Sequence, residues 1–190
     1  MESINIIQVK KDDLKKRQNF VDIYKQVFSE APYFETYNDE WVIKNVWQQH
    51  LVNGFIVLAL CGKEIIGLGC CIPLLKISDD DPNVKVKNFL LGRQDIPISL
   101  HLTCYMSEVA VLQKFRHAGL GRRLVQERFA LAKEAGLSSY IMRTAASGSL
   151  SEKIYLSLGA QEAEVLQDVS DHAEEVNSSS KLRKFLYGRL

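Results

Sequence analysis

Residues 108–124, EVAVLQKFRHAGLGRRL, decide how this chain is expected to fold. A run containing β-branched residues leads into the turn RHAGLG at residues 116–121 and then into an amphipathic segment, which predicts strand, turn and helix start. The first N–H groups of a helix have no partners within it and lie at the positive end of its dipole, and glycine lets a phosphate approach the backbone. The turn therefore predicts an anion site, and a phosphate-bearing cofactor is the first hypothesis.

The segments on either side of this stretch alternate between strand and helix patterns. We expect strands at residues 4–9, 55–60, 65–74, 98–112, 139–144, 162–169 and 181–189. Helices are expected after Asp12 or Asp13 and at residues 40–51, 120–135 and 150–158. Residues 76–97 are expected to form a long, partly irregular connection, and residues 171–180 a polar loop. Because a hairpin precedes a strand-helix-strand crossover, the order predicts an α+β fold with a mixed sheet.

Composition limits the function classes. A length of 190 residues with 46% hydrophobic content predicts one domain spanning residues 1–190. The 24 Lys and Arg residues nearly balance the 23 Asp and Glu residues, which gives no overall electrostatic case for binding nucleic acid or an anionic membrane. The chain has no signal-peptide pattern and no apolar run near ~18 residues, so we expect a cytoplasmic location. The four cysteines lack paired spacing, which favours buried, reduced thiols and no metal.

Two motifs at a compatible separation resemble the GNAT superfamily of N-acetyltransferases, which use acetyl-CoA. In that family a strand ending in Leu/Val-x-Val precedes Arg/Gln-x-x-Gly-x-Gly/Ala and a helix; here residues 109–111 are VAV and residues 116–121 are RHAGLG. The family then places a tyrosine in a short helix before Gly-Phe, and Tyr155 stands here before Gly159 and Ala160. The resemblance implies a mixed, mostly antiparallel central sheet flanked by helices.

The resemblance also implies how acetyl-CoA is held as co-substrate. The backbone of the VAV segment would pair with the pantetheine arm, and the N–H groups of the turn would hold the pyrophosphate. Arg116 and Arg122 would add positive charge. The implied cofactor-binding residues are Val109, Ala110, Val111, Arg116, His117, Ala118, Gly119, Leu120, Gly121 and Arg122.

Glu108 is the candidate general base, because an amine must lose a proton when it is acetylated. At strict alternation this carboxylate shares a strand face with five apolar residues, Leu102, Cys104, Met106, Ala110 and Leu112. The alternative is a β-bulge that turns Glu108 toward solvent or an arginine. A reserve set on the opposite face comprises His101, Tyr105 and Ser107.

Tyr155 has two interpretations. The resemblance implies that it lies near the thioester sulfur and donates a proton to the departing thiolate. The apolar stripe of its own helix, with Leu150, Ile154 and Leu158, would instead suit a core aromatic residue.

The sequence indicates the acceptor substrate less clearly than the cofactor. We expect direct transfer from acetyl-CoA to an amine on a small molecule, because Cys104 has no nearby triad pattern for a covalent intermediate. Three aromatic residues between the first two helices are candidates for the substrate wall: Tyr33, Phe34 and Tyr37. Acetylation of a peptide or protein is the first alternative. A non-catalytic acyl-CoA sensor is the second, motivated by Gly148 where the family often has Asn. Whether the chain acts alone or as a homodimer stays open.

Overall fold

The computed structural model describes residues 3–146, 149–168, 175–176 and 182–190. Gly148 lies outside these ranges, as do most residues of the loop expected at 171–180. No helix within the described ranges has the length and apolar character needed to cross a membrane.

A seven-stranded sheet in the order β1-β3-β4-β5-β6-β9-β7 forms the centre of the molecule. Its strands are β1 (Ile4–Gln8), β3 (Phe55–Cys61), β4 (Glu64–Pro73), β5 (Thr103–Val111), β6 (Ser139–Ala145), β7 (Gln161–Asp168) and β9 (Leu182–Arg189). β5 and β6 are parallel, and every other neighbouring pair is antiparallel. A second, two-stranded sheet joins β2 (Glu35–Thr36) to β8 (Glu175–Val176). The predicted α+β fold with a mostly antiparallel sheet is confirmed.

Helical segments occupy most of the connections. They are η1 (Leu14–Lys16), α1 (Arg17–Phe28), α2 (Asp39–Val42), η2 (Ile43–Gln48), α3 (Gln49–Asn53), η3 (Leu74–Lys76), α4 (Val84–Leu91), η4 (Leu100–Leu102), η5 (Gln113–Phe115), α5 (Leu120–Glu134) and α6 (Leu150–Ser157). Three differ from expectation. A π-helical turn, η2, interrupts the helix expected at residues 40–51; α4 lies within the connection expected to be partly irregular; and η4 replaces the start of the strand expected from residue 98.

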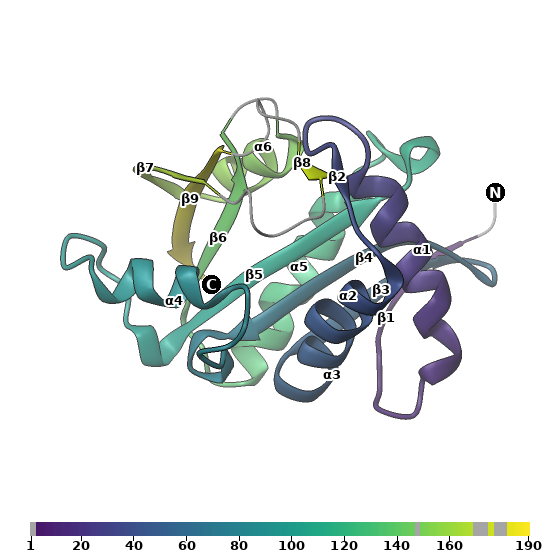
Figure 1. The fold of residues 1–190 in the computed structure, drawn as a ribbon, viewed down its shortest axis with the longest axis horizontal. Helices are drawn as coiled ribbons and strands as arrows, with labels where there is room; N and C mark the ends of the chain where they lie inside the picture. Colours follow the sequence, from purple (N-terminus) through teal and green to yellow (C-terminus); the bar gives the residue numbers. More distant parts are fainter. Residues whose placement is uncertain (1–2, 147–148, 169–174, 177–181) are drawn as a thin grey trace.

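The helices cover both faces of the sheet (Figure 1). On one face, α1 buries Phe20 and Tyr24 in a cluster that also contains Leu58 and Leu68 of the sheet. On the other face, Leu120 and other apolar residues of α5 pack against β3 and β4. Helix α5 begins after Gly119, which has a left-handed backbone conformation. A second left-handed glycine, Gly136, follows the helix, which is a common way for a helix to end.

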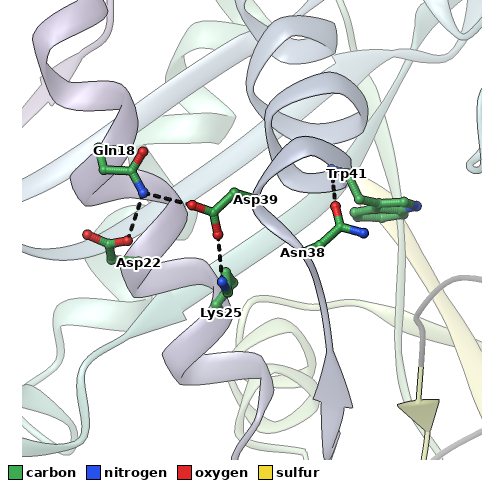
Figure 2. Close-up of polar contacts among 6 residues, drawn as sticks. All are labelled: Gln18, Asp22, Lys25, Asn38, Asp39 and Trp41. Carbon is green, nitrogen blue, oxygen red and sulfur yellow. Dashed lines mark hydrogen bonds and ion pairs between the residues drawn. The ribbon is translucent and has the colours of Figure 1, made fainter.

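Polar contacts fix the start of α2 against α1 (Figure 2). Asp39 accepts hydrogen bonds from Gln18 at 3.0 Å and from Lys25 at 2.5 Å. Asn38 caps α2 by accepting from the backbone N–H of Trp41 at 2.7 Å. These contacts hold the start of α2, which carries Trp41, against α1.

Candidate active site

β5 and β6 separate after a short stretch of pairing. Their parallel ladder consists of Thr103↔Ser139, Cys104↔Tyr140 and Tyr105↔Ile141. Beyond it β5 continues to Val111, while β6 stays paired with β9, and Figure 1 shows the two strands diverging near α6. Both strands are described throughout, and within them the ladder does not resume. The edge of β5 that faces this gap is therefore open to an extended ligand that adds like a strand.

A β-bulge in β5 redirects Glu108. Cys70 of β4 pairs with Glu108, whereas Ile72 pairs with Tyr105, so β5 carries one extra residue between these pairs. An extra residue reverses the side on which every later side chain lies. Glu108 and Tyr105 consequently line one pocket.

The strict alternation expected for β5 is therefore wrong. Cys104 and Met106 pack in the cluster on the α5 side, whereas Ala110 packs in the cluster around α1. The side chain of Glu108 lies on the same side of the sheet as that of Ala110, opposite to those of Cys104 and Met106, which precede the bulge. The bulge anticipated as the alternative is present, and it aims the carboxylate into a pocket.

The glycine turn opens α5 as expected. Gly119 has φ +79° and His117 has φ +64°, so two residues of the turn adopt left-handed conformations. At Gly119 this conformation has little steric cost, because glycine has no Cβ atom. Gly119 is the N-cap residue, and no side chain caps the helix. The first N–H groups of α5 therefore have no side-chain cap and are suited to an anion.

A cleft runs along this turn and the open edge of β5. It lies between β5, the turn and α6, and its lining also includes Val27 of α1 and Ala31 and Pro32 of the loop after α1. Of the predicted cofactor residues, those that line it are Val109, Val111, Arg116, His117, Gly119, Leu120, Gly121 and Arg122. Ala110 is buried against α1 instead, and Ala118 is exposed.

The two arginines of the turn already have protein partners. Arg116 donates through Nε to the carbonyl of Val111 at 2.8 Å and through Nη2 to Glu30 at 2.5 Å. Arg122 donates to Ser157 Oγ at 2.8 Å. Arg116 thus ties the turn to the loop that follows α1, in addition to any charge that it offers a ligand.

A second pocket lies on the α1 side of the sheet, beside the first. Tyr33 and Tyr37 line it, as the sequence predicts, but Phe34 is 47% exposed and outside the lining. Further aromatic walls come from Tyr24, Phe28, Trp41 and Tyr105. The polar part of the lining comes from Glu35, Asn45, Asn83, Ser107, Glu108, Arg143, Ser151 and Arg183. We call this the acceptor pocket.

Sequence reasoning missed the ion pair between Glu35 and Arg183 in this pocket. Both side chains are buried and paired with each other, and Tyr37 donates to Glu35 at 2.8 Å. Arg183 also lies over the Tyr33 ring, 5.3 Å from its centroid. The partners come from β2 and β9, at opposite ends of the chain, so no local pattern could have indicated the pair.

Burial determines the charge state of Glu108. The pKa of this carboxyl is raised from 4.5 to about 8, by burial most of all and then by the neighbouring Glu35, while Arg143, Arg128 and Arg183 act in the opposite direction. A half-buried carboxyl with a pKa near neutrality is suited to accept a proton from a bound amine.

Tyr155 is held by a buried arginine. Arg128 of α5 is fully buried and donates through Nη2 to Tyr155 Oη at 2.9 Å and through Nη1 to the carbonyls of Cys70 and Glu108. Burial raises the pKa of Tyr155, so its phenol keeps its proton at neutral pH. Because the phenol oxygen accepts from Arg128, its own hydrogen is available to another acceptor.

The cleft and the acceptor pocket meet. Val109, Tyr33 and Ser151 line both, and Tyr155 lines the acceptor pocket together with Glu108. A candidate base and a candidate acid therefore lie where an extended ligand along β5 would reach an acceptor molecule. In the part of the chain that the structure describes, no cluster of His, Cys, Asp or Glu side chains could hold a metal ion.

A family model confirms the resemblance. Residues 19–160 match the model described as the acetyltransferase (GNAT) family. The chain belongs to this family. Membership confirms that it is an acetyltransferase with acetyl-CoA as acetyl donor, and the cleft along β5 fits such a donor because it joins an open strand edge to an uncapped helix start. A search of the curated proteins by sequence found no match.

Solved structures share the fold at low identity. The mosquito arylalkylamine N-acetyltransferase like 5b is 17% identical with a TM-score of 0.69, covering 99% of this chain and 100% of that one. Ribosomal-protein-alanine N-acetyltransferase from Brucella melitensis is 15% identical with a TM-score of 0.67, covering 98% and 99%. The yncA protein of Salmonella typhimurium, solved with its cofactor acetyl-CoA, is 14% identical with a TM-score of 0.65, covering 98% and 94%.

Proposed function

We propose that this acetyltransferase moves acetyl directly from acetyl-CoA to an amine on a small molecule held in the acceptor pocket. The observation that carries the proposal is the meeting of the two cavities at Val109, beside Glu108 and Tyr155. Acetyl-CoA supplies an activated thioester. The backbone edge of β5 would align it, and the N–H groups after Gly119 would bind its pyrophosphate.

Glu108 acts as the base in this proposal. A primary ammonium has a pKa near ~10, so it must lose a proton before or during its attack. The raised pKa of Glu108 favours taking up that proton, and uptake removes a charge that burial and Glu35 disfavour.

Tyr155 acts as the acid. Its phenol is protonated at neutral pH, and Arg128 occupies the oxygen as a donor, which leaves the phenol hydrogen for the departing thiolate. The buried guanidinium would also stabilise negative charge that develops on the phenol oxygen.

The walls of the acceptor pocket favour a small acceptor. The loop that carries Tyr33 and Tyr37 is tied to the C-terminal part of the sheet by the Glu35–Arg183 ion pair. In addition, β2 pairs with β8 at Glu35↔Val176 and Thr36↔Glu175. These links tie the loop to the sheet on one side of the pocket, which supports a small acceptor over an extended peptide.

CoA release tests this function. The purified protein is given acetyl-CoA and matched acceptors: small primary amines, and peptides that carry the same amino group at their N-terminus. We expect thiol release with small amines and little with the peptides. Release with peptides alone would overturn the small-molecule acceptor, and calorimetric binding of acetyl-CoA without release for any acceptor would favour a sensor.

A further inference from the structure

Two oppositely charged side chains of the acceptor pocket come from the strands that separate, β5 and β6. Glu108 belongs to β5 and Arg143 to β6, and both line the pocket. The last pair of the parallel ladder is Tyr105↔Ile141. Arg143 therefore stands two residues beyond this pair on β6, on the same face of the sheet as Ile141.

The bulge brings Glu108 to the matching level of β5. Three steps along β5, from Tyr105 to Glu108, span two steps along its partner β4. Glu108 thus occupies the second position beyond the parallel ladder, as Arg143 does on β6. Of the three arginines that lower the pKa of Glu108, Arg143 has the largest effect, as expected of close neighbours across the gap.

The other two charged side chains of the lining neutralise each other. Glu35 and Arg183 form the buried ion pair, and Arg183 also donates to the carbonyl of Leu182 at 3.3 Å. Among the lining residues this leaves one acidic and one basic group, Glu108 and Arg143, whose charges a ligand can match. Arg143 is half-buried, and the five N–H donors of a guanidinium allow a ligand to bind alongside its contacts within the protein.

We propose that the acceptor is an amine that also carries a carboxylate, as an amino acid does, with its amino group at Glu108 and its carboxylate on Arg143. This inference rests on the proposed function and names the class of its acceptor. A guanidinium binds a carboxylate through two parallel N–H···O bonds, which fixes the orientation of the acceptor. Its amino group then lies on the β5 side, next to Val109, where the cleft and the acceptor pocket meet.

Acceptors without a carboxylate match the pocket less well. A simple amine can bind Glu108 through its ammonium but offers no negative charge to Arg143. A diamine would place a second positive charge near that guanidinium and is repelled by it. The aromatic walls from Tyr33 and Trp41 suit an apolar remainder of the molecule.

The test compares amino acids with their decarboxylated counterparts in the CoA-release assay. The pairs are alanine with ethylamine, leucine with isopentylamine, and phenylalanine with phenethylamine. For the wild type we expect the amino acid to have the higher kcat/KM within each pair. Arg143→Gln should lower kcat/KM for the amino acids by about 10- to 100-fold, the range for losing a hydrogen bond to a charged group, and change it far less for the amines. Arg143→Lys keeps the charge and should restore part of the preference.

The ratio of kcat/KM values within a pair separates carboxylate binding from other effects. Arg143 lowers the pKa of Glu108, so its replacement also changes proton uptake, but both members of a pair experience that change. Arg17→Gln removes the same charge at the exposed start of α1 and should leave the ratio unchanged. The thermal midpoint of each variant checks that it folds.

The outcomes distinguish this inference from the function on which it rests. CoA release by the wild type that is as fast with the decarboxylated amines as with the amino acids, or faster, would overturn the inference while the proposed function stands. A folded Arg143→Gln variant that keeps the wild-type ratio would overturn it as well. No CoA release by the wild type with any small amine would overturn the function and this inference with it.

Discussion

The pH dependence of acetyl transfer should change when Glu108 is replaced by Gln. In the folded protein the pKa of Glu108 is raised from 4.5 to about 8, so the carboxyl is protonated at pH 6 and ionised above pH 8. For an ammonium substrate, kcat/KM of the wild type should rise about tenfold per pH unit up to pH 8 and then level.

The glutamine variant has no carboxylate to take the proton. It depends on amine that is already neutral, which is about 1% of an amine with a pKa near 10 at pH 8. The variant should therefore be about 100-fold slower than the wild type at pH 8, and the difference should shrink toward pH 10.

The assay is steady-state thiol release between pH 6 and pH 10. Glu127→Gln, on the exposed side of α5, is the matched control and should keep the wild-type profile. Equal calorimetric affinity of Glu108→Gln for acetyl-CoA would show that the donor site is intact. A variant whose profile still breaks near pH 8, or whose rate equals that of the wild type there, would refute Glu108 as the base.

Four further outcomes are expected. Because the folded-state pKa of Glu108 is raised, the wild type should lose stability relative to Glu108→Gln as the pH rises from about 4.5 to about 8. A difference between the urea midpoints of the two proteins that is the same at pH 4 and pH 9 would contradict this. Tyr155→Phe should lower kcat about 10- to 100-fold with little change in KM, and an unchanged kcat would exclude the phenol as acid. Cys104→Ala should retain acetyl transfer; its loss in a folded variant would point to a cysteine-linked intermediate. Phe20→Ala should lower the unfolding free energy by about 3–5 kcal/mol in urea titrations, because this ring is fully buried.

Local patterns predicted most of the elements. The helix expected at residues 120–135 is α5, and the strand expected at residues 139–144 is β6 with one more residue. Glycine turns and apolar periodicity mark such elements within a few residues of sequence. The π-helical turn η2 carries no comparable signal, because its backbone pattern keeps the apolar residues Val46 and Trp47 on a buried face.

The bulge in β5 shows where sequence periodicity stops being informative. A single extra residue reverses the side of Glu108 relative to Met106, and nothing in the local pattern shows where pairing with β4 shifts. The sequence could identify the carboxylate as unusual but could not give its direction.

The acceptor pocket depends on contacts between distant parts of the chain. Glu35 meets Arg183, and His50 meets Ser107, across long separations in sequence. A single sequence shows which residue types are present but does not show which distant residues contact one another. The cleft along β5 is easier to predict, because eight of its lining residues, from Val109 to Arg122, belong to one continuous strand-turn-helix segment.

A crystal structure with acetyl-CoA tests the central claim most directly. The account predicts pantetheine along Val109 and Val111, pyrophosphate at the N–H groups after Gly119, and the thioester where the cleft meets the acceptor pocket, within reach of Tyr155. Acetyl-CoA bound elsewhere, or with its thioester turned away from Tyr155 and the acceptor pocket, would contradict it.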